Sequence, residues 1–177
     1  MRKVAVLCAA ATSEYKRLEG VEVYDKRRDA RTFPGGMPVV AHPPCRGWSR
    51  WLWRQAKPEK GERELALFCV EQVRRWGGVL EHPRLSWLWP AARLPLPGRK
   101  DRWGFCIEVW QVWWGFPCRK ATWLYIVGVD EEDLPPIPFR LHPGGDHTGY
   151  KRLSRHQRME FARWLVEVAR KCKACKG

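Results

Sequence analysis

Three short segments carry side chains that could do chemistry together. They are Pro43-Pro44-Cys45, Glu81-His82-Pro83 and Gly115-Phe116-Pro117, the last followed closely by Lys120. The first two follow apolar runs that predict strands, and the third precedes such a run. In open α/β sheets, ligands bind at strand ends. A thiol, a carboxylate and a cation gathered there could attack a pyrimidine ring and hold its edge.

Cys45 is the candidate nucleophile. Proline fixes its own φ and restricts the preceding residue, so the two prolines hold the thiol in a rigid loop. Arg46 and Arg50 would favour its thiolate. The alternative is a buried structural thiol. His42 precedes the first segment and His82 lies within the second, and both could join a proton relay or be plain loop residues.

The apolar pattern predicts the elements that must position these segments. It predicts strands at residues 4–8, 21–25, 38–42 and 79–81, with a short helix after Ser13 and a longer one at residues 61–76. Such a β-α-β beginning favours a parallel sheet. Two last strands, at residues 107–113 and 122–129, are expected to be antiparallel neighbours. A capping box at Ser154-Arg155-His156-Gln157 predicts a final helix to about residue 171.

We therefore expect one compact α/β domain over residues 1–177, with a mostly parallel sheet, an antiparallel end and flanking helices. Residues 172–177 are predicted to be a flexible tail. Cys172-Lys173-Ala174-Cys175 has a metal-ligand spacing, but no second pair accompanies it, so we expect no metal. No signal peptide follows Met1-Arg2-Lys3, and no segment has the roughly 20 apolar residues of a membrane span. We expect reduced thiols, a cytoplasmic location and no membrane partner.

The charge of the chain points to a polyanionic partner. Its 33 Lys and Arg against 19 Asp and Glu give a net charge of +14, and it contains 12 Trp. Such a charge attracts nucleic acid, and indoles beside cations can stack on unpaired bases. The alternatives are a generic basic surface and tryptophans that fill the core.

Three motifs resemble those of the DNA cytosine-5 methyltransferases. Val40-Ala41-His42-Pro43-Pro44-Cys45-Arg46-Gly47-Trp48-Ser49 resembles the family's Pro-Pro-Cys loop, and Val79-Leu80-Glu81-His82-Pro83 is similar to its Glu-Asn-Val strand end. Gly115-Phe116-Pro117-Cys118-Arg119-Lys120-Ala121-Thr122 resembles its Gly-Val-Pro-Gln segment, which two arginines follow. The resemblance covers about residues 4–129. The pattern is also similar to small phage-borne proteins of methyltransferase type that lack a target-recognition domain.

The resemblance implies a Rossmann-like methyltransferase sheet and roles for three side chains. Cys45 would attack carbon 6 of cytosine, Glu81 would hold ring nitrogen 3 and the exocyclic amine, and Lys120 would replace the first arginine. The donor would be S-adenosylmethionine, although the family's glycine-rich loop is here Leu7-Cys8-Ala9-Ala10-Ala11-Thr12. The implied cofactor-binding residues are Cys8, Ala9, Ala10, Asp25, Asp29 and Pro43. The implied DNA-binding residues are Arg46, Trp48, Ser49, Arg50, Trp53, Arg119 and Thr122.

The leading hypothesis is therefore methylation of DNA cytosine at carbon 5, in the cytoplasm of a bacterial host and carried by a phage as protection from restriction. One alternative is modification of a pyrimidine base or nucleotide with a different donor. Another is an inactive relative that binds DNA through its basic, Trp-rich surface. A zinc nucleobase deaminase is set aside because its His-x-Glu signature is absent.

Overall fold

The protein is built on one mixed sheet. The computed structural model describes residues 1–50, 57–116, 120–140 and 155–174, with 155–158 as backbone only. In these residues six strands lie in the order β2-β1-β3-β4-β6-β5. Their bounds are Val4–Leu7 (β1), Val21–Tyr24 (β2), Val39–Ala41 (β3), Gly78–Pro83 (β4), Gly104–Trp110 (β5) and Ala121–Val127 (β6).

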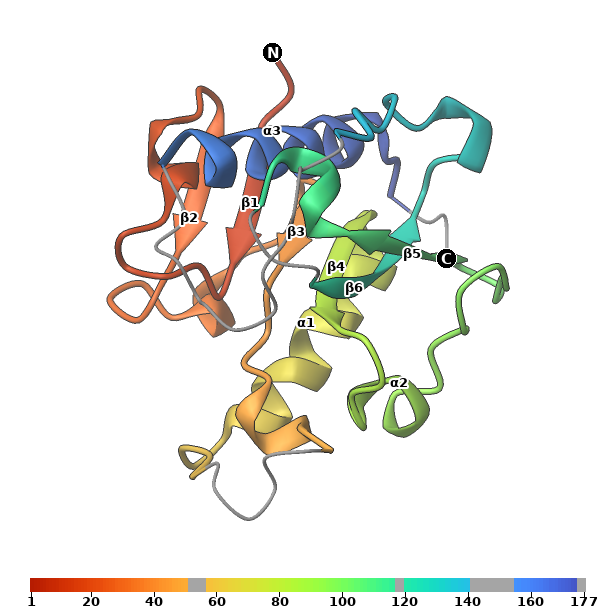
Figure 1. Cartoon of the computed structure of the whole chain (residues 1–177). Coiled ribbons are helices and arrows are strands. Elements are labelled where there is room, and N and C mark those ends of the chain that lie inside the picture. The colour runs from red at the N-terminus through yellow and green to blue at the C-terminus, as the bar shows by residue number, and fades with distance from the viewer. Residues whose placement is uncertain (51–56, 117–119, 141–154, 175–177) are drawn as a thin grey trace.

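Strands β2, β1, β3 and β4 run parallel, while β6 is antiparallel to both of its neighbours, β4 and β5. The predicted parallel sheet with an antiparallel end is confirmed. The chain passes from β1 outward to β2 and then returns to β3 on the other side of β1 (Figure 1). This reversal makes the carboxyl ends of β1 and β3 a topological switch point, where open α/β sheets form their binding crevices.

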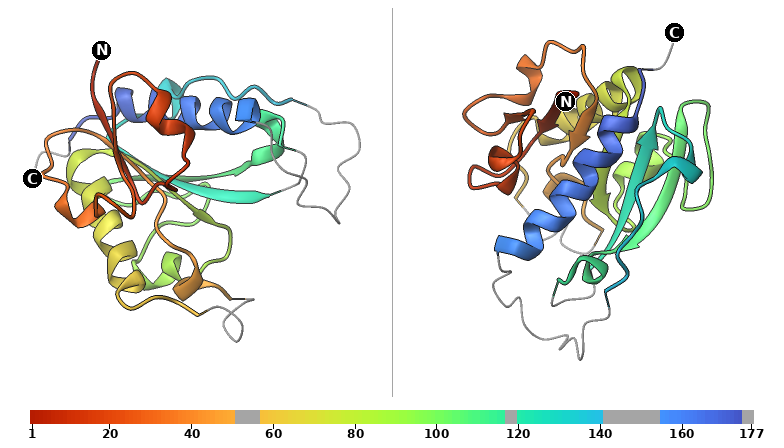
Figure 2. Two further views of the ribbon diagram at one scale, coloured as in Figure 1. Left: turned by 90° about the vertical axis from the view of Figure 1, so that its left-hand side faces the viewer. Right: turned by 90° about the horizontal axis from the view of Figure 1, so that it is seen from above.

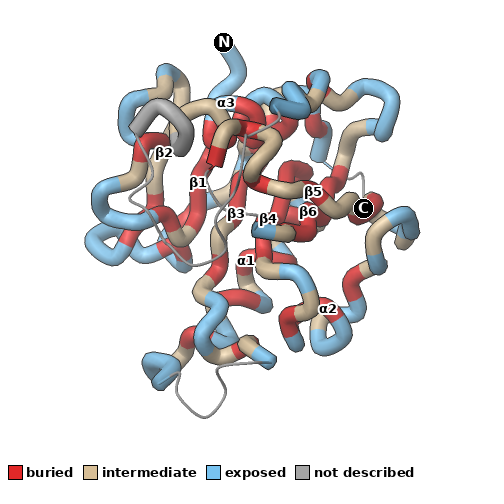
Figure 3. Tube along the Cα trace, viewed as in Figure 1, coloured by how far each residue is buried: buried red, intermediate tan, exposed pale blue. Residues whose placement is uncertain are grey.

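Helices cover both faces of the sheet. Helix α1 (Glu62–Trp76) lies on one face and α3 (Arg155–Lys171) on the other (Figure 2). Strand side chains alternate between faces, so Val4 and Val6 join the cluster that contains α3, whereas Ala5 and Leu7 join the cluster that contains α1. The buried residues therefore follow the central strands (Figure 3). The α/β class and the helix predicted at residues 61–76 are confirmed.

Short helical segments occupy the connections. They are the 3-10 helices η1 (Glu14–Arg17), η2 (Ala30–Thr32), η3 (Arg46–Trp48), η4 (Gln111–Trp114) and η5 (Glu131–Asp133), and the one-turn α2 (Leu88–Ala91). The strand predicted at residues 107–113 is displaced, because β5 ends at Trp110 and the chain turns into η4. That turn packs Trp114 against Phe161 and Trp164 of α3, at ring distances of 4.7 and 5.2 Å.

The expected tail begins as part of the core. Cys172 is fully buried and its thiol donates to the Val168 carbonyl, and Lys173 N donates to the Gly128 carbonyl at 2.6 Å. Cys175 and the capping residue Ser154 lie outside the described residues. Within the part of the chain that the structure describes, no helix is both long and apolar enough to cross a membrane.

Candidate active site

Glu81 lies at the centre of a polar cluster on the α3 side of the sheet. It sits near the carboxyl end of β4 and is only 9 % exposed. Its Oε2 lies 3.0 Å from His42 Nδ1, and its Oε1 lies 3.8 Å from Lys120 Nζ. Because a carboxylate only accepts hydrogen bonds, the imidazole Nδ1 carries the proton and donates it. The structure thus brings Glu81 and Lys120 together, as predicted, and places His42, the relay candidate that follows β3, against Glu81.

Two further side chains complete this cluster. Tyr15 Oη of η1 lies 2.8 Å from His42 Nε2. Gln111 Nε2 donates to Thr122 Oγ1 at 3.0 Å and to Glu81 Oε1 at 3.4 Å. Sequence reasoning missed Tyr15 and Gln111, because each looked like an ordinary member of a helix turn or a strand. Thr122 was predicted to contact DNA, but it is fully buried and bonded inside the cluster.

Glu81 is charged at neutral pH. Burial raises the pKa of its carboxyl, but the hydrogen bond from His42 and the positive charge of Lys120, with smaller electrostatic contributions from the His42 and His82 rings, outweigh that effect and hold the pKa at about 2. At neutral pH the Glu81 carboxylate therefore accepts hydrogen bonds and has no proton to donate. Any step that protonates a ring through Glu81 needs another group to supply the proton.

His82 lies on the opposite face of β4 and is fully buried. Burial lowers its pKa to about 4, although the Glu81 charge and the Pro44 carbonyl favour the protonated form. Neither ring nitrogen makes a hydrogen bond of normal geometry to any described residue. His82 is therefore a neutral side chain beneath the Pro43-Pro44-Cys45 loop.

Cys45 is an exposed free thiol at the start of η3, where its carbonyl accepts a hydrogen bond from Trp48 N at 3.1 Å. The alternative of a buried structural thiol is thereby excluded. Within the described part of the chain, no hydrogen bond or ion pair joins Cys45 to Glu81. The two groups lie at the ends of neighbouring parallel strands, β3 and β4, so a bound ring would have to connect them.

The two arginines near Cys45 are engaged elsewhere. Arg46 pairs with Glu59 at 2.9 Å and with Glu62, and the Arg50 guanidinium lies 4.3 Å from the ring centre of Trp87. Stabilisation of the Cys45 thiolate by these cations stays a prediction.

A cavity of about 670 Å³ lies at the switch point between β1 and β3. Five of the six predicted cofactor residues line it, and Pro44 lines it in place of the sixth, Pro43. The lining residues are Cys8, Ala9, Ala10, Ala11, Asp25, Lys26, Asp29, Ala30, Arg31, His42, Pro44, Glu59, Glu62 and Leu65. His42 therefore borders this cavity and also contacts Glu81.

Cys8 takes the backbone conformation that a glycine would favour. Its φ is +60°, in the left-handed region, which is uncommon and costly for a residue with a Cβ. The sharp turn after β1 thus forms without glycine. Its thiol lies 3.6 Å from the Cys69 thiol of α1, so the turn is packed directly on that helix.

Asp25 is already well bonded. One carboxylate oxygen accepts from the backbone amides of Arg27 and Arg28, at 2.8 and 3.2 Å, and the other accepts from Lys16 Nζ at 2.6 Å. The Lys16 hydrogen bond and the two amides lower its pKa to about 2. Asp29 likewise caps η2 and pairs with Arg31. Both carboxylates line the cavity.

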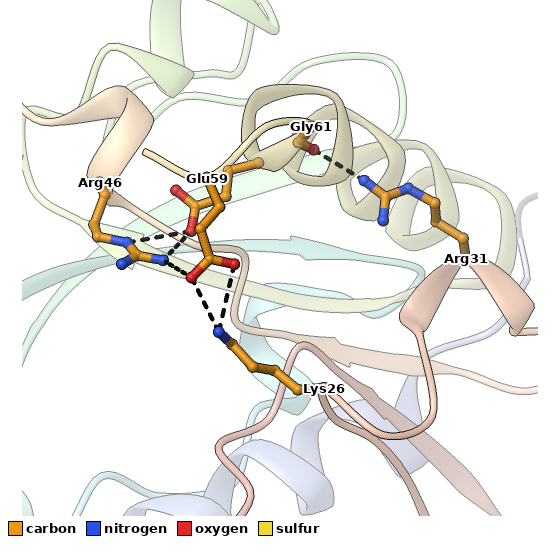
Figure 4. Close-up of polar contacts among 6 residues, drawn as sticks. Lys26, Arg31, Arg46, Glu59 and Gly61 are labelled. Carbon is orange, nitrogen blue, oxygen red and sulfur yellow. Dashed lines mark hydrogen bonds and ion pairs between the residues drawn. The ribbon is translucent and has the colours of Figure 1, made fainter. Parts of the chain in front are cut away.

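Ion pairs tie three segments together around the cavity (Figure 4). Glu59 accepts from Lys26 at 3.0 Å and from Arg46, so it joins the loops after β2 and β3. Arg31 donates to the Gly61 carbonyl at 2.9 Å, next to the start of α1.

A second cavity, of about 780 Å³, adjoins η3 and is basic and aromatic. Its lining contains four of the predicted DNA-binding residues, together with Arg63 and Trp87. The lining residues are Arg46, Gly47, Trp48, Ser49, Arg50, Pro58, Arg63, Trp87, Pro90 and Ala91. The predicted residues Trp53 and Arg119 lie outside the described residues.

Comparisons with family models, curated proteins and solved structures found no match to this chain. Among the described residues, no three His, Cys, Asp or Glu side chains group as a metal site would require.

Proposed function

We propose that this protein is a DNA-modifying enzyme that methylates cytosine at carbon 5. Cys45 is the nucleophile for carbon 6, Glu81 and Lys120 hold the edge of the base, and S-adenosylmethionine is the donor. In duplex DNA the target base has to leave the stack to reach such a site.

One observation carries the proposal. The cavity at the switch point is bordered by His42, which contacts Glu81, and is lined by the residues that the resemblance assigns to the cofactor. The cofactor cavity lies after β1, the Cys45 loop follows β3, and Glu81 lies on β4. These three strands are neighbours in the sheet, which supports transfer of a group from a cofactor to a base. The mixed sheet with its reversed strand β6 is also the sheet that a Rossmann-like methyltransferase domain would use.

The donor fits the residues that are present. A cavity of about 670 Å³ lies within the size range of small-molecule sites, and the left-handed turn at Cys8 exposes the following alanines to it. Cys8, Ala9 and Ala10 would border the ligand on one side, and Asp25 and Asp29 on the other. When bound, S-adenosylmethionine would supply an electrophilic methyl group.

The proposal is tested by incubating the protein with cytosine-containing DNA and S-adenosylmethionine and measuring 5-methylcytosine by nucleoside mass spectrometry. We expect methylation by the wild-type protein and none by Cys45→Ser. Cys106→Ser is the matched control, because the Cys106 thiol is buried in the core, and burial raises its pKa to about 12. Methylation by Cys45→Ser at the wild-type rate would refute the assignment of the nucleophile.

A different donor is the second candidate, and Asp25 favours it. Its carboxylate is bonded to Lys16 and two amides, so the acceptor that a ribose would use is partly taken. Isothermal titration with S-adenosylmethionine separates the two: no heat of binding, alongside a Cys45-dependent change in the DNA, would favour the different donor.

A further inference from the structure

His42 is the one side chain among the described residues that both borders the switch-point cavity and hydrogen-bonds Glu81. It is 22 % exposed at its side chain, whereas Glu81 is 11 % exposed. Tyr15, itself buried, holds the opposite ring nitrogen at 2.8 Å. Tyr15, His42 and Glu81 therefore form a continuous hydrogen-bonded chain from η1 through β3 to β4.

We propose that His42 supplies the proton that Glu81 passes to the pyrimidine ring, with Tyr15 fixing the imidazole by its far nitrogen. His42 is thus a positioning and proton-supplying residue that acts through Glu81. The inference rests on the proposed function, because it concerns the same reaction.

The Cys45 thiolate forms a bond to carbon 6, the carbon 5–carbon 6 π pair moves to carbon 4–carbon 5, and the carbon 4–nitrogen 3 π pair moves onto nitrogen 3. The imidazolium of His42 gives its Nδ1 proton to the Glu81 carboxylate, and Glu81 passes a proton to nitrogen 3, so Glu81 ends as it began, as a carboxylate. The imidazole that remains is neutral and keeps its proton on Nε2. Once carbon 5 has gained the methyl group and released its own proton to water, nitrogen 3 returns its proton through Glu81 to His42, the π pairs move back and Cys45 departs as the thiolate.

Tyr15 can serve both protonation states of His42. A hydroxyl is both donor and acceptor and rotates to suit its partner. The Tyr15 hydroxyl accepts a hydrogen bond from Nε2–H when Nε2 is protonated. When Nδ1 alone is protonated, the hydroxyl donates a hydrogen bond to Nε2 instead. The contact therefore survives the transfer and the ring stays in place.

Other charged groups surround this chain and contribute to its field. The charged ones are Lys120 before β6 and, around the cavity, Asp25, Lys26, Asp29, Arg31, Glu59 and Glu62, and the titratable side chains His82 of β4 and Cys8 also lie there. All four cavity carboxylates are paired: Asp25 with Lys16, Asp29 with Arg31, Glu59 with Lys26 and Arg46, and Glu62 with Arg46. Among the described residues, Lys120 Nζ and His42 Nδ1 contact the Glu81 carboxylate, at 3.8 and 3.0 Å.

The test is the pH profile of single-turnover DNA methylation in three variants. Asn at position 42 places an amide N–H where Nδ1 lies but does not titrate, so His42→Asn keeps the contact and removes the proton supply. We expect it to lower the rate by about 100-fold and to abolish the fall in rate at high pH. Tyr15→Phe should lower the rate less. Tyr24→Phe is the control, because Tyr24, at the end of β2, accepts a hydrogen bond from Arg28 and contacts neither His42 nor Glu81 through any hydrogen bond among the described residues.

A wild-type pH profile in His42→Asn would overturn the proposal while leaving the proposed function intact. No methylation by the wild-type protein at any pH would overturn both. The ¹⁵N spectrum of the His42 imidazole tests the hydrogen-bond chain independently of activity. Nδ1 should be protonated, and the Nε2 resonance should shift in the Tyr15→Phe variant. An unchanged Nε2 resonance would contradict the chain even in an active enzyme.

Discussion

At the scale of single residues, buried His82 should make stability depend on pH. Its pKa is about 4 in the folded protein, against 6.5 in an unfolded chain, because burial disfavours the charged ring. Between these values the unfolded state binds the extra proton, so stability falls as the pH falls from 6.5 to 4. We expect a loss of about 3 kcal/mol in the free energy of unfolding from pH 7 to pH 4.

Urea unfolding of the wild-type protein and His82→Phe at both pH values measures this effect. Phe leaves no unbonded polar atom in the site, so the variant should lack most of the pH dependence and should be at least as stable at pH 4. Equal pH slopes in the two proteins would show that His82 does not titrate as expected.

The strained turn at Cys8 gives a second residue-scale prediction. Its φ of +60° suits glycine and is least tolerated by a β-branched side chain. The Cys8→Gly variant should therefore be more stable than the Cys8→Val variant, with a free energy of unfolding about 2 kcal/mol higher. Thermal and urea unfolding of both variants measure the difference. A more stable Val variant would mean that packing against Cys69 outweighs backbone strain.

The sequence predicted the candidate catalytic and cofactor-binding residues better than the side chains that hydrogen-bond them in place. Cys45 and Glu81 stand in recognisable motifs, and five of the six predicted cofactor residues do border one cavity. Tyr15 and Gln111 carry no such signal, since their roles come from contacts between elements far apart in the chain. The periodicity of apolar residues predicts on which face of a helix or strand a side chain lies. It does not predict which side chain from a distant part of the sequence contacts it.

At the scale of elements, η4 joins the antiparallel end of the sheet to α3. The sequence predicted a strand through Trp113, because apolar residues recur beyond Trp110 at Val112 and Trp113. Packing of Trp114 on Phe161 and Trp164 turns the chain instead, and so directs Gln111 toward Glu81. Tertiary contacts override local propensity at this point.

Loss of the Trp114 side chain, which anchors η4 on α3, should lower the stability of the protein. Trp114 is 1 % exposed, so Trp114→Ala should lower the free energy of unfolding by about 3 to 5 kcal/mol. Trp87→Ala is the control: Trp87 is 51 % exposed, and its loss should cost about 0.5 kcal/mol or less. Chemical denaturation compares the two, and equal losses would contradict the role of η4 as an anchor.

At the scale of the whole molecule, the charge of +14 predicts DNA binding that weakens steeply with salt. The basic cavity beside η3 is the proposed contact, with Arg50 stacked on Trp87. If Arg50 neutralises a phosphate, Arg50→Ala should reduce the slope of log affinity against log salt by about 1.

Fluorescence anisotropy over a salt series measures these slopes. Arg75→Ala on α1 is the matched control, since Arg75 is also exposed and lies over a tryptophan, Trp76, outside the cavity. The control should keep the wild-type slope. Equal slopes in all three proteins would mean that charge spread over the surface, rather than this cavity, binds the DNA.

The central claim is that Cys45 bonds covalently to a cytosine. DNA that contains 5-fluorocytosine tests it most directly, because fluorine at carbon 5 cannot leave as a proton does and the adduct is trapped. With S-adenosylmethionine present, intact mass spectrometry should show a methylated protein–DNA complex that maps to Cys45 and is absent from Cys45→Ser. DNA bound tightly at low salt with no covalent complex formed would contradict the enzyme and identify a DNA-binding protein instead.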